Sequence, residues 1–210
     1  MQFRPGPRER YRAAACDHDP LRIVLLGAPG SGKGTQGERL AERLGANHVA
    51  SGELLRAHVD AESDLGVEVA ACLARGDLVP DDVVLAVVCE AVTTACESGG
   101  YILDGFPRTR AQAERAYELA RPKNIEAEAA VYLALSDDVA RRRLAGRARA
   151  GRVDDADAGV IERRLQLFHA NTRPILDFYE QRGILVTVDA VEPVEAVTET
   201  ILDLLARNAS

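Results

Sequence analysis

Lysine is almost absent from this sequence: of its 26 basic residues, all but Lys33 and Lys123 are arginine. The chain has no excess of positive charge either, because 33 acidic residues give it a net charge of −7. Proteins that coat nucleic acid rely on a basic surface to contact the phosphate backbone. The composition therefore argues against a nucleic-acid partner, and it makes the position of Lys33 inside a glycine-rich segment informative.

Long apolar runs are also missing. The longest strongly apolar run covers residues 83–89, far short of the roughly 18 residues that indicate a membrane span. Residues 1–20 contain four arginines and three acidic residues but no apolar core, unlike a secretory signal or a transit peptide. We therefore expect a cytoplasmic protein without a membrane partner. Residues 1–20 are expected to be a disordered tail, or the product of a start codon placed too far upstream, with the folded domain beginning at Leu21.

No metal-binding pattern is present among the four cysteines and four histidines. Cys16, Cys72, Cys89 and Cys96 form no C-x-x-C pair, and the histidines form no H-E-x-x-H pattern. We expect reduced thiols in a cytosolic protein and no metal held by such a cluster.

Short apolar runs alternate with helical patterns along the chain. Residues 21–26 are a nearly continuous apolar run that ends at a glycine, which indicates a buried parallel strand. The expected strands are 21–26, 47–50, 101–103, 129–135 and 184–188. The expected helices are 33–44, 51–59, 64–75, 81–97, 109–121, 137–147, 160–181 and 193–207. This alternation predicts an α/β fold, in which helices cover both faces of a five-stranded parallel sheet.

Two segments interrupt the alternation. One is the helical stretch at residues 51–79, and the other is the segment 148–159, which is rich in Arg, Asp and Gly. Inserts at the carboxyl ends of parallel strands lie over the ligand crevice of such folds. Both segments are therefore candidates for moving covers.

A glycine-rich loop, GAPGSGKGT at residues 27–35, follows the first expected strand and opens the first helix. Its glycines allow backbone N–H groups to surround an anion at the positive end of the helix, and Lys33 adds a full charge. The hydroxyl that usually follows the lysine comes one residue later, at Thr35. The loop predicts a nucleoside triphosphate site of the kind found in GTPases, ATPase motors and small-molecule kinases; without an N-K-x-D sequence, guanine selection has no support. The residues expected to bind the triphosphate are Gly30, Ser31, Gly32, Lys33, Gly34 and Thr35.

Three segments in register resemble the adenylate kinase family of nucleoside monophosphate kinases: GAPGSGKGTQ at 27–36, YILDGFPR at 101–108 and GRVDD at 151–155. The resemblance implies a P-loop NTPase fold with a small helical AMP-binding insert and a short lid insert. The parts that it implies are a core of residues 21–50, 80–147 and 160–210, an AMP-binding insert at 51–79 and a lid at 148–159.

The resemblance implies reversible transfer of the γ-phosphoryl group of Mg-ATP to AMP, giving two ADP and serving adenine nucleotide homeostasis. The transfer would be a direct in-line displacement without a phosphoenzyme, stabilised by the phosphate loop and by arginines, with lid closure excluding water. Asp104 would hold Mg²⁺ through water, and its strand would lie beside the strand that ends at Gly27. Relatives with long lids often carry zinc-binding cysteines, whereas this lid is short and has none, so no zinc is expected. Short-lid relatives are often monomers, and we expect a monomer here.

The resemblance places the acceptor site on the insert and on the GFPR segment. Ser51 stands where relatives have threonine, Arg56 would hold the AMP phosphate, and Gln112 would read the adenine edge from the same helix face as Arg108. Related UMP/CMP kinases typically have alanine and asparagine at the positions of Ser51 and Gln112, so the base choice depends on these two residues. The AMP-binding residues that it implies are Ser51, Arg56, Asp77, Leu78, Val79, Val84, Gly105, Phe106, Pro107, Arg108, Gln112, Arg152 and Arg164.

The resemblance also implies that arginines in the second half of the chain take part in phosphoryl transfer. Arg143 would lie against the ATP adenine on the same helix face as Arg147, and the backbone around Glu192 would touch the same base. Compared with short-lid relatives, the stretch after Asp155 holds an extra residue near Gly159. Either Arg163 or Arg164 can therefore correspond to the catalytic arginine of the family. The apolar stripe of the helix places Arg164 at the cleft edge and Arg163 toward solvent, which favours Arg164. The catalytic set is Lys33, Arg108, Arg147, Arg152 and Arg164, and the ATP site adds Arg143, Arg147 and Glu192.

Two other functions stay open on the sequence alone. One is a UMP/CMP kinase with the same fold, and the other is a regulatory switch that binds ATP without transferring phosphate. The choice of acceptor separates the kinases, and any product formation excludes the switch.

Overall fold

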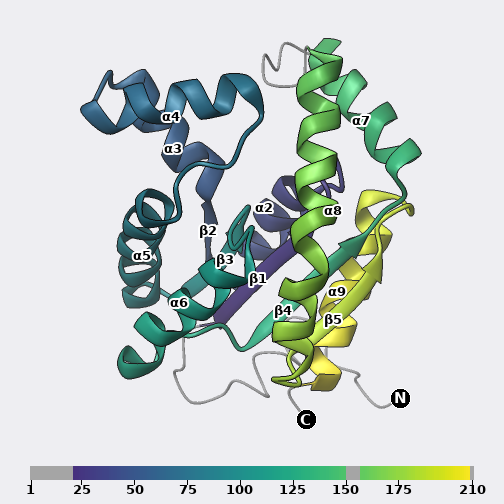
Figure 1. Cartoon of the computed structure of the whole chain (residues 1–210). Coiled ribbons are helices and arrows are strands. Elements are labelled where there is room, and N and C mark those ends of the chain that lie inside the picture. The colour runs from purple at the N-terminus through teal and green to yellow at the C-terminus, as the bar shows by residue number, and fades with distance from the viewer. Residues whose placement is uncertain (1–20, 150–156, 209–210) are drawn as a thin grey trace, which may run out of the picture.

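A five-stranded parallel sheet forms the centre of the computed structural model, which describes residues 21–149 and 157–208. The strand order is β2-β3-β1-β4-β5, and every pairing is parallel (Figure 1). The strands are β1 (Leu21–Gly27), β2 (Asn47–Ala50), β3 (Gly100–Asp104), β4 (Ala129–Ala134) and β5 (Leu185–Asp189). The predicted α/β fold class is confirmed.

The helices follow the expected pattern to within one or two residues at their ends, and one short helix is added. They are α2 (Lys33–Leu44), α3 (Ser51–Asp60), α4 (Asp64–Arg75), α5 (Asp81–Glu97), α6 (Arg110–Ala120), α7 (Asp137–Arg149), α8 (Ala158–Glu180) and α9 (Val194–Asn208). Helix α8 begins before residue 160 because the Asp157 carboxylate accepts the N–H groups of Gly159 (2.6 Å) and Val160 (3.1 Å). A short 3₁₀ helix, η1 (Arg121–Lys123), follows α6.

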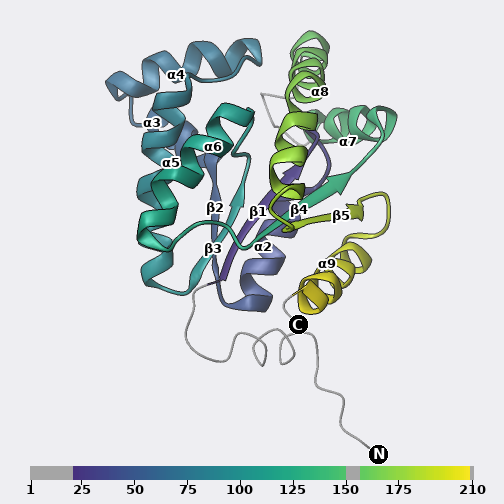
Figure 2. The same ribbon diagram turned by 60° about the horizontal axis from the view of Figure 1, so that its bottom comes forward.

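Residues of β1 alternate between two apolar cores. Val24 and Leu26 pack with residues of α5, α6 and α8, whereas Ile23 and Leu25 pack with residues of α2 and α9. Side chains of a strand point alternately to opposite faces of the sheet, so helices on both faces are needed to bury a strand this apolar. The ribbon shows these two helical layers from two directions (Figures 1 and 2).

The carboxyl end of the sheet is flanked by helices that extend beyond it. Helices α3 and α4 lie on one side, and α7 and the N-terminal half of α8 lie on the other (Figure 2). We call residues 51–79 the insert. Strands β1 and β3 are neighbours, with Leu25 paired to Asp104, so the phosphate loop and Asp104 emerge side by side as predicted. In the part of the chain that the structure describes, no helix is long and apolar enough to cross a membrane.

Candidate active site

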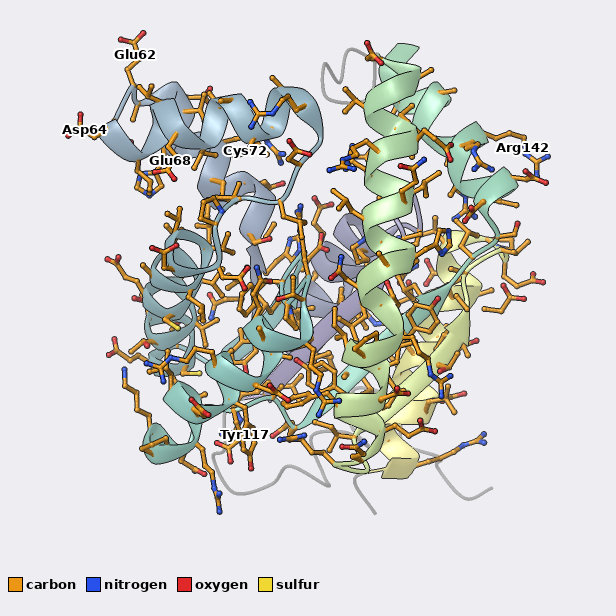
Figure 3. All side chains as sticks on the ribbon, in the orientation of Figure 1. Glu62, Asp64, Glu68, Cys72, Tyr117 and Arg142 are labelled. Carbon is orange, nitrogen blue, oxygen red and sulfur yellow. The ribbon has the colours of Figure 1, made fainter. Side chains whose placement is uncertain are left out.

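A cleft of about 920 Å³ lies at the carboxyl end of the sheet. Its walls come from the phosphate loop, the insert, the end of β3, helices α7 and α8, and the loop before α9. Some charged side chains lie away from this cleft: Glu62 and Asp64 point outward at the far end of the insert, and Arg142 points outward from α7 (Figure 3). The chemistry therefore depends on the smaller set of charges on the inner walls.

The phosphate loop is held in a curled form by its own backbone. Gly30 and Gly32 have φ angles of +82° and +94°, a region that strains residues with a Cβ atom. The Lys33 ammonium group donates hydrogen bonds to the carbonyl groups of Gly27 (2.9 Å) and Ala28 (3.0 Å). The lysine side chain therefore lies folded back along the loop.

Lys33 lies in a group of charges that suits a polyanion. Burial lowers its pKa to about 8; Asp104 opposes this shift, and Arg108, Arg164 and Arg147 add to it. Basic side chains that repel one another in the free protein are stabilised by an anionic ligand. The group can therefore bind phosphates and balance their negative charge.

The part of the cleft that is expected to bind the acceptor is closely packed around Gly105. This glycine has a φ angle of +79°, and a Cβ atom added to it would lie 2.6 Å from the Ser51 hydroxyl oxygen. The Arg108 guanidinium donates to the Gly105 carbonyl (2.7 Å). The surrounding protein atoms lower the pKa of Arg108 although its side chain is open to the cleft; Arg164 and Arg56 also lower it, and Asp104 raises it. Arg56 and Arg164 therefore both lie close enough to Arg108 to affect its charge.

A second cavity of about 120 Å³ extends the cleft toward α8. Of the residues expected at the acceptor site, those that line it are Leu78, Gly105, Pro107, Arg108 and Arg164. Arg56 lines the larger cleft. The buried members of the expected set, which line neither cavity, are Ser51, Val79, Val84, Phe106 and Gln112.

Gln112 has a partner that the sequence analysis missed. Its amide oxygen accepts the backbone N–H of Arg108 (2.6 Å), and its amide nitrogen donates to the Asp81 carboxylate (2.6 Å). Asp81 is the first residue of α5, a position where a carboxylate is already favourable next to the helix N-terminus. Because the helix N-terminus already explains a carboxylate at this position, the sequence gives no sign of the contact between Asp81 and Gln112, which are 31 residues apart.

Comparisons with known proteins agree with this geometry. A family model for adenylate kinase matches residues 25–184. The adenylate kinase of Synechococcus sp. (strain WH7803) is 44% identical over 185 residues, which cover 88% of this chain and 98% of that relative. Those of Xanthomonas euvesicatoria pv. vesicatoria (strain 85-10) and Thermobifida fusca (strain YX) are 42% and 38% identical, covering 89% and 90% of this chain and all of each relative. The chain belongs to the adenylate kinase family.

As a member of the adenylate kinase family, the protein is a phosphotransferase that moves phosphoryl groups between adenine nucleotides. Helix α7 is linked to the loop before α9: the Arg143 guanidinium donates to the carbonyl of Ala190 (2.9 Å) and, at 3.4 Å, to that of Val191. Arg147 and Glu192 line the same cleft. Arg152, the remaining arginine of the expected set, and the expected tail at 1–20 lie outside the described residues, as does most of the expected lid.

Two neighbouring arginines of α8 take different places in this adenylate kinase family member. Arg164 lines both cavities. Arg163 is exposed, and its guanidinium donates to the Asp77 carboxylate of the insert (3.1 Å) rather than projecting freely into solvent. Arg75 and then Arg163 lower the pKa of Asp77 by donating to it. Arg163 thus joins α8 to the insert, whereas Arg164 lines the cleft and the cavity beside it.

Asp104 meets one requirement of a Mg²⁺ site in an adenylate kinase. One oxygen of its carboxylate is buried and accepts no hydrogen bond within the described protein. Hard divalent cations prefer oxygen ligands, and Mg²⁺ usually keeps several waters, so one carboxylate next to the phosphates suffices. Asp104 fits the ion that accompanies ATP.

Proposed function

We propose that this protein transfers the γ-phosphoryl group of Mg-ATP reversibly to AMP, giving two ADP. One observation carries this proposal: Arg56, Arg108 and Arg164 line the same cleft as the phosphate loop. They supply a second phosphate-binding set, which a protein that only binds ATP does not need. We further propose that the enzyme acts as a monomer in the cytoplasm, where the reaction balances the adenine nucleotides.

The proposed chemistry depends on position and charge. The attacking oxygen belongs to the AMP phosphate and is already ionised, so no general base is required. Negative charge spreads over the equatorial oxygens of the moving group, and cations held around it stabilise that charge. Lys33, Arg108, Arg147 and Arg164 are the proposed cations, and the family resemblance adds Arg152 from the lid.

Mg²⁺ and the two bases complete the proposed site. When bound, the ion would neutralise charge on the β- and γ-phosphates, held by Asp104 through water. Ser51 and Gln112 are the proposed readers of the acceptor adenine, and Arg143 with the backbone near Glu192 would contact the donor base. Closure of the lid and the insert would exclude water, so that transfer outcompetes hydrolysis.

Product stoichiometry tests this function. The purified chain is incubated with Mg-ATP and AMP, and the nucleotides and inorganic phosphate are quantified chromatographically. We expect two ADP for each AMP consumed and no inorganic phosphate. A control with γ-labelled ATP and no AMP should leave no label on the protein. ADP with free phosphate, or ATP binding without any turnover, would contradict the proposal and favour a hydrolase or a regulatory switch.

A further inference from the structure

The amide group of Gln112 is held at both ends by partners that cannot exchange roles. At one end the backbone N–H of Arg108 can only donate, and at the other the carboxylate of Asp81 can only accept; both distances are 2.6 Å. Gln112 is 1% exposed, so water does not compete strongly for these bonds. The amide oxygen must therefore face Arg108, and the NH₂ group must face Asp81.

Asp81 is itself held in place by α6. The hydroxyl of Thr109, the residue that caps α6, lies 3.4 Å from the second carboxylate oxygen of Asp81 and accepts the backbone N–H of Gln112 (3.1 Å). Asp81 begins the helix that directly follows the insert, whereas Gln112 lies on the helix that follows Arg108. The hydrogen bonds thus fix the amide relative to both segments of the acceptor side.

A fixed amide leaves one kind of group for a ligand. One N–H of the NH₂ group is used by Asp81, so the other is a hydrogen-bond donor with a set direction. A base that offers a ring nitrogen without hydrogen, as adenine and cytosine do, can accept from it. Guanine and uracil have an N–H at the corresponding ring position, so two donors would meet and one would lose its partner.

We propose that Asp81 is a specificity-determining residue, which acts by holding the Gln112 amide in the orientation that donates to the acceptor base. This inference rests on the proposed function, in which the acceptor base reaches Gln112 when bound, although Gln112 lines neither cavity in this structure. Asp81 is a positioning residue and touches no substrate. Without Asp81, only the hydrogen bond from the Arg108 N–H to the amide oxygen would orient Gln112. The preference for this amide orientation should therefore become weaker but should not disappear.

Acceptor selectivity is the measurement that isolates this role. Variants Asp81→Ala, Asp81→Ser and Asp81→Asn are compared with the wild type for kcat/KM on AMP and GMP at saturating Mg-ATP. We expect the AMP-over-GMP ratio to fall about tenfold in the first two, the order of one hydrogen bond to a charged group, mainly through KM for AMP. Asp81→Asn keeps an oxygen that can accept, and it should restore the ratio to within about threefold of wild type.

Asp82 offers a matched control. It is the second acidic residue in the first turn of α5 and is exposed, so Asp82→Ala removes the same charge from the helix N-terminus. This variant should keep the wild-type ratio. An equal loss on AMP and GMP in Asp81→Ala and Asp81→Ser, together with a lower Tm, would overturn the proposal, because the pair would then only support the loop before α6.

Gln112→Ala separates this inference from the proposed function. If Gln112→Ala lowers the AMP-over-GMP ratio and the Asp81 variants do not, the inference alone fails. If Gln112→Ala leaves the ratio unchanged, Gln112 does not read the base, and the inference fails with that part of the proposed function. If both act through one amide, adding Asp81→Ala to Gln112→Ala should cause no further loss of selectivity.

Discussion

The phosphate loop is built from one short stretch of chain, whereas the proposed acceptor side of the cleft is assembled from separate segments. Residues 27–35 form the loop with their own backbone, and the lysine donates to carbonyl groups inside it. The proposed acceptor side joins Asp81 of α5, Arg108 of the loop between β3 and α6, and Gln112 of α6. The phosphate loop is therefore encoded locally, while the proposed choice of base would depend on tertiary contacts.

This difference leads to a general expectation. Substitutions among the phosphate-binding cations should reduce turnover with every acceptor, because all nucleotides share the phosphates. Substitutions around Gln112 should instead change which acceptor is used. Single-residue variants can test this separation, beginning with those of largest expected effect.

Two neighbouring residues of α8 give the largest expected contrast. Arg164→Ala should lower kcat by about 10³-fold or more, as expected for an arginine that contacts the moving phosphoryl group, which corresponds to about 4 kcal/mol. Arg163→Ala removes the same charge from the adjacent position and should change kcat by less than about threefold. Steady-state kcat with saturating Mg-ATP and AMP measures both, and thermal unfolding checks that both variants fold.

Similar losses in the two variants would contradict the assignment of Arg164 to the phosphates. A reversed order would mean that the helix turns its other face to the ligands when nucleotides bind. In either case the lining of the two cavities by Arg164 would not reflect the reacting state.

Lys33→Met tests the charge of the phosphate loop. We expect kcat/KM to fall about 10²-fold or more with every acceptor, the typical loss when one donor to a developing charge is removed. The free protein should nevertheless become more stable at neutral pH, because a buried cation with a lowered pKa opposes folding. Steady-state kinetics and thermal unfolding without ligand measure the two effects.

The sign of the pH dependence follows from the same lysine. Its pKa is about 8 in the folded protein, against an ordinary value of 10.5 for a lysine in water, so between these values the unfolded chain binds more protons. Lys33 therefore makes the fold more stable as the pH rises from about 8 to 10.5, and it contributes a destabilising charge below that range. Bound phosphates should raise the pKa again, so ATP binding near pH 8 should take up about half a proton. Calorimetry in buffers of different ionisation enthalpy, with Lys33→Met as control, measures this proton uptake. If the wild-type protein takes up no protons on binding ATP, the lowered pKa of Lys33 is contradicted.

The sequence predicted the parts of the molecule that depend on local pattern. Apolar periodicity located the strands and helices, and the same periodicity distinguished Arg164 from Arg163 on α8. It could not predict that Arg163 pairs with Asp77, because that contact joins residues 86 positions apart and depends on how the insert sits against α8. Asp81 was missed for a similar reason: a helix-terminal carboxylate already has a sufficient local explanation.

Ser51→Ala should have a moderate effect on the acceptor and almost none on the fold. Ser51 is 1% exposed, and its hydroxyl accepts or donates no hydrogen bond within the described protein. Its removal breaks no internal bond, so stability should stay the same or rise by up to about 1 kcal/mol. If the hydroxyl serves AMP, KM for AMP should rise about fivefold, the order of one neutral hydrogen bond. Denaturant unfolding and initial rates measure the two quantities, and a clear loss of stability would show that the hydroxyl has a structural partner.

The ion pair between Arg163 and Asp77 should have the smallest effect. Both side chains reach solvent, with exposed fractions of 53% and 30%, so their attraction is screened. Asp77→Asn should change KM for AMP by less than about twofold, and raising the salt concentration should remove the difference. A larger change that persists at high salt would mean that this pair sets the position of the insert.

The most direct test of this account is a panel of acceptors. Initial rates are measured for the wild-type protein with fixed Mg-ATP and with AMP, CMP, UMP or GMP over a range of concentrations. We predict a kcat/KM for AMP about 10²-fold or more above each of the others, because guanine and uracil would place an N–H against the proposed Gln112 donor, and because Ser51 and Gln112 differ from the residues typical of UMP/CMP kinases. Preference for CMP or UMP would leave the phosphate assignments in place and contradict the proposed base reading by Ser51 and Gln112.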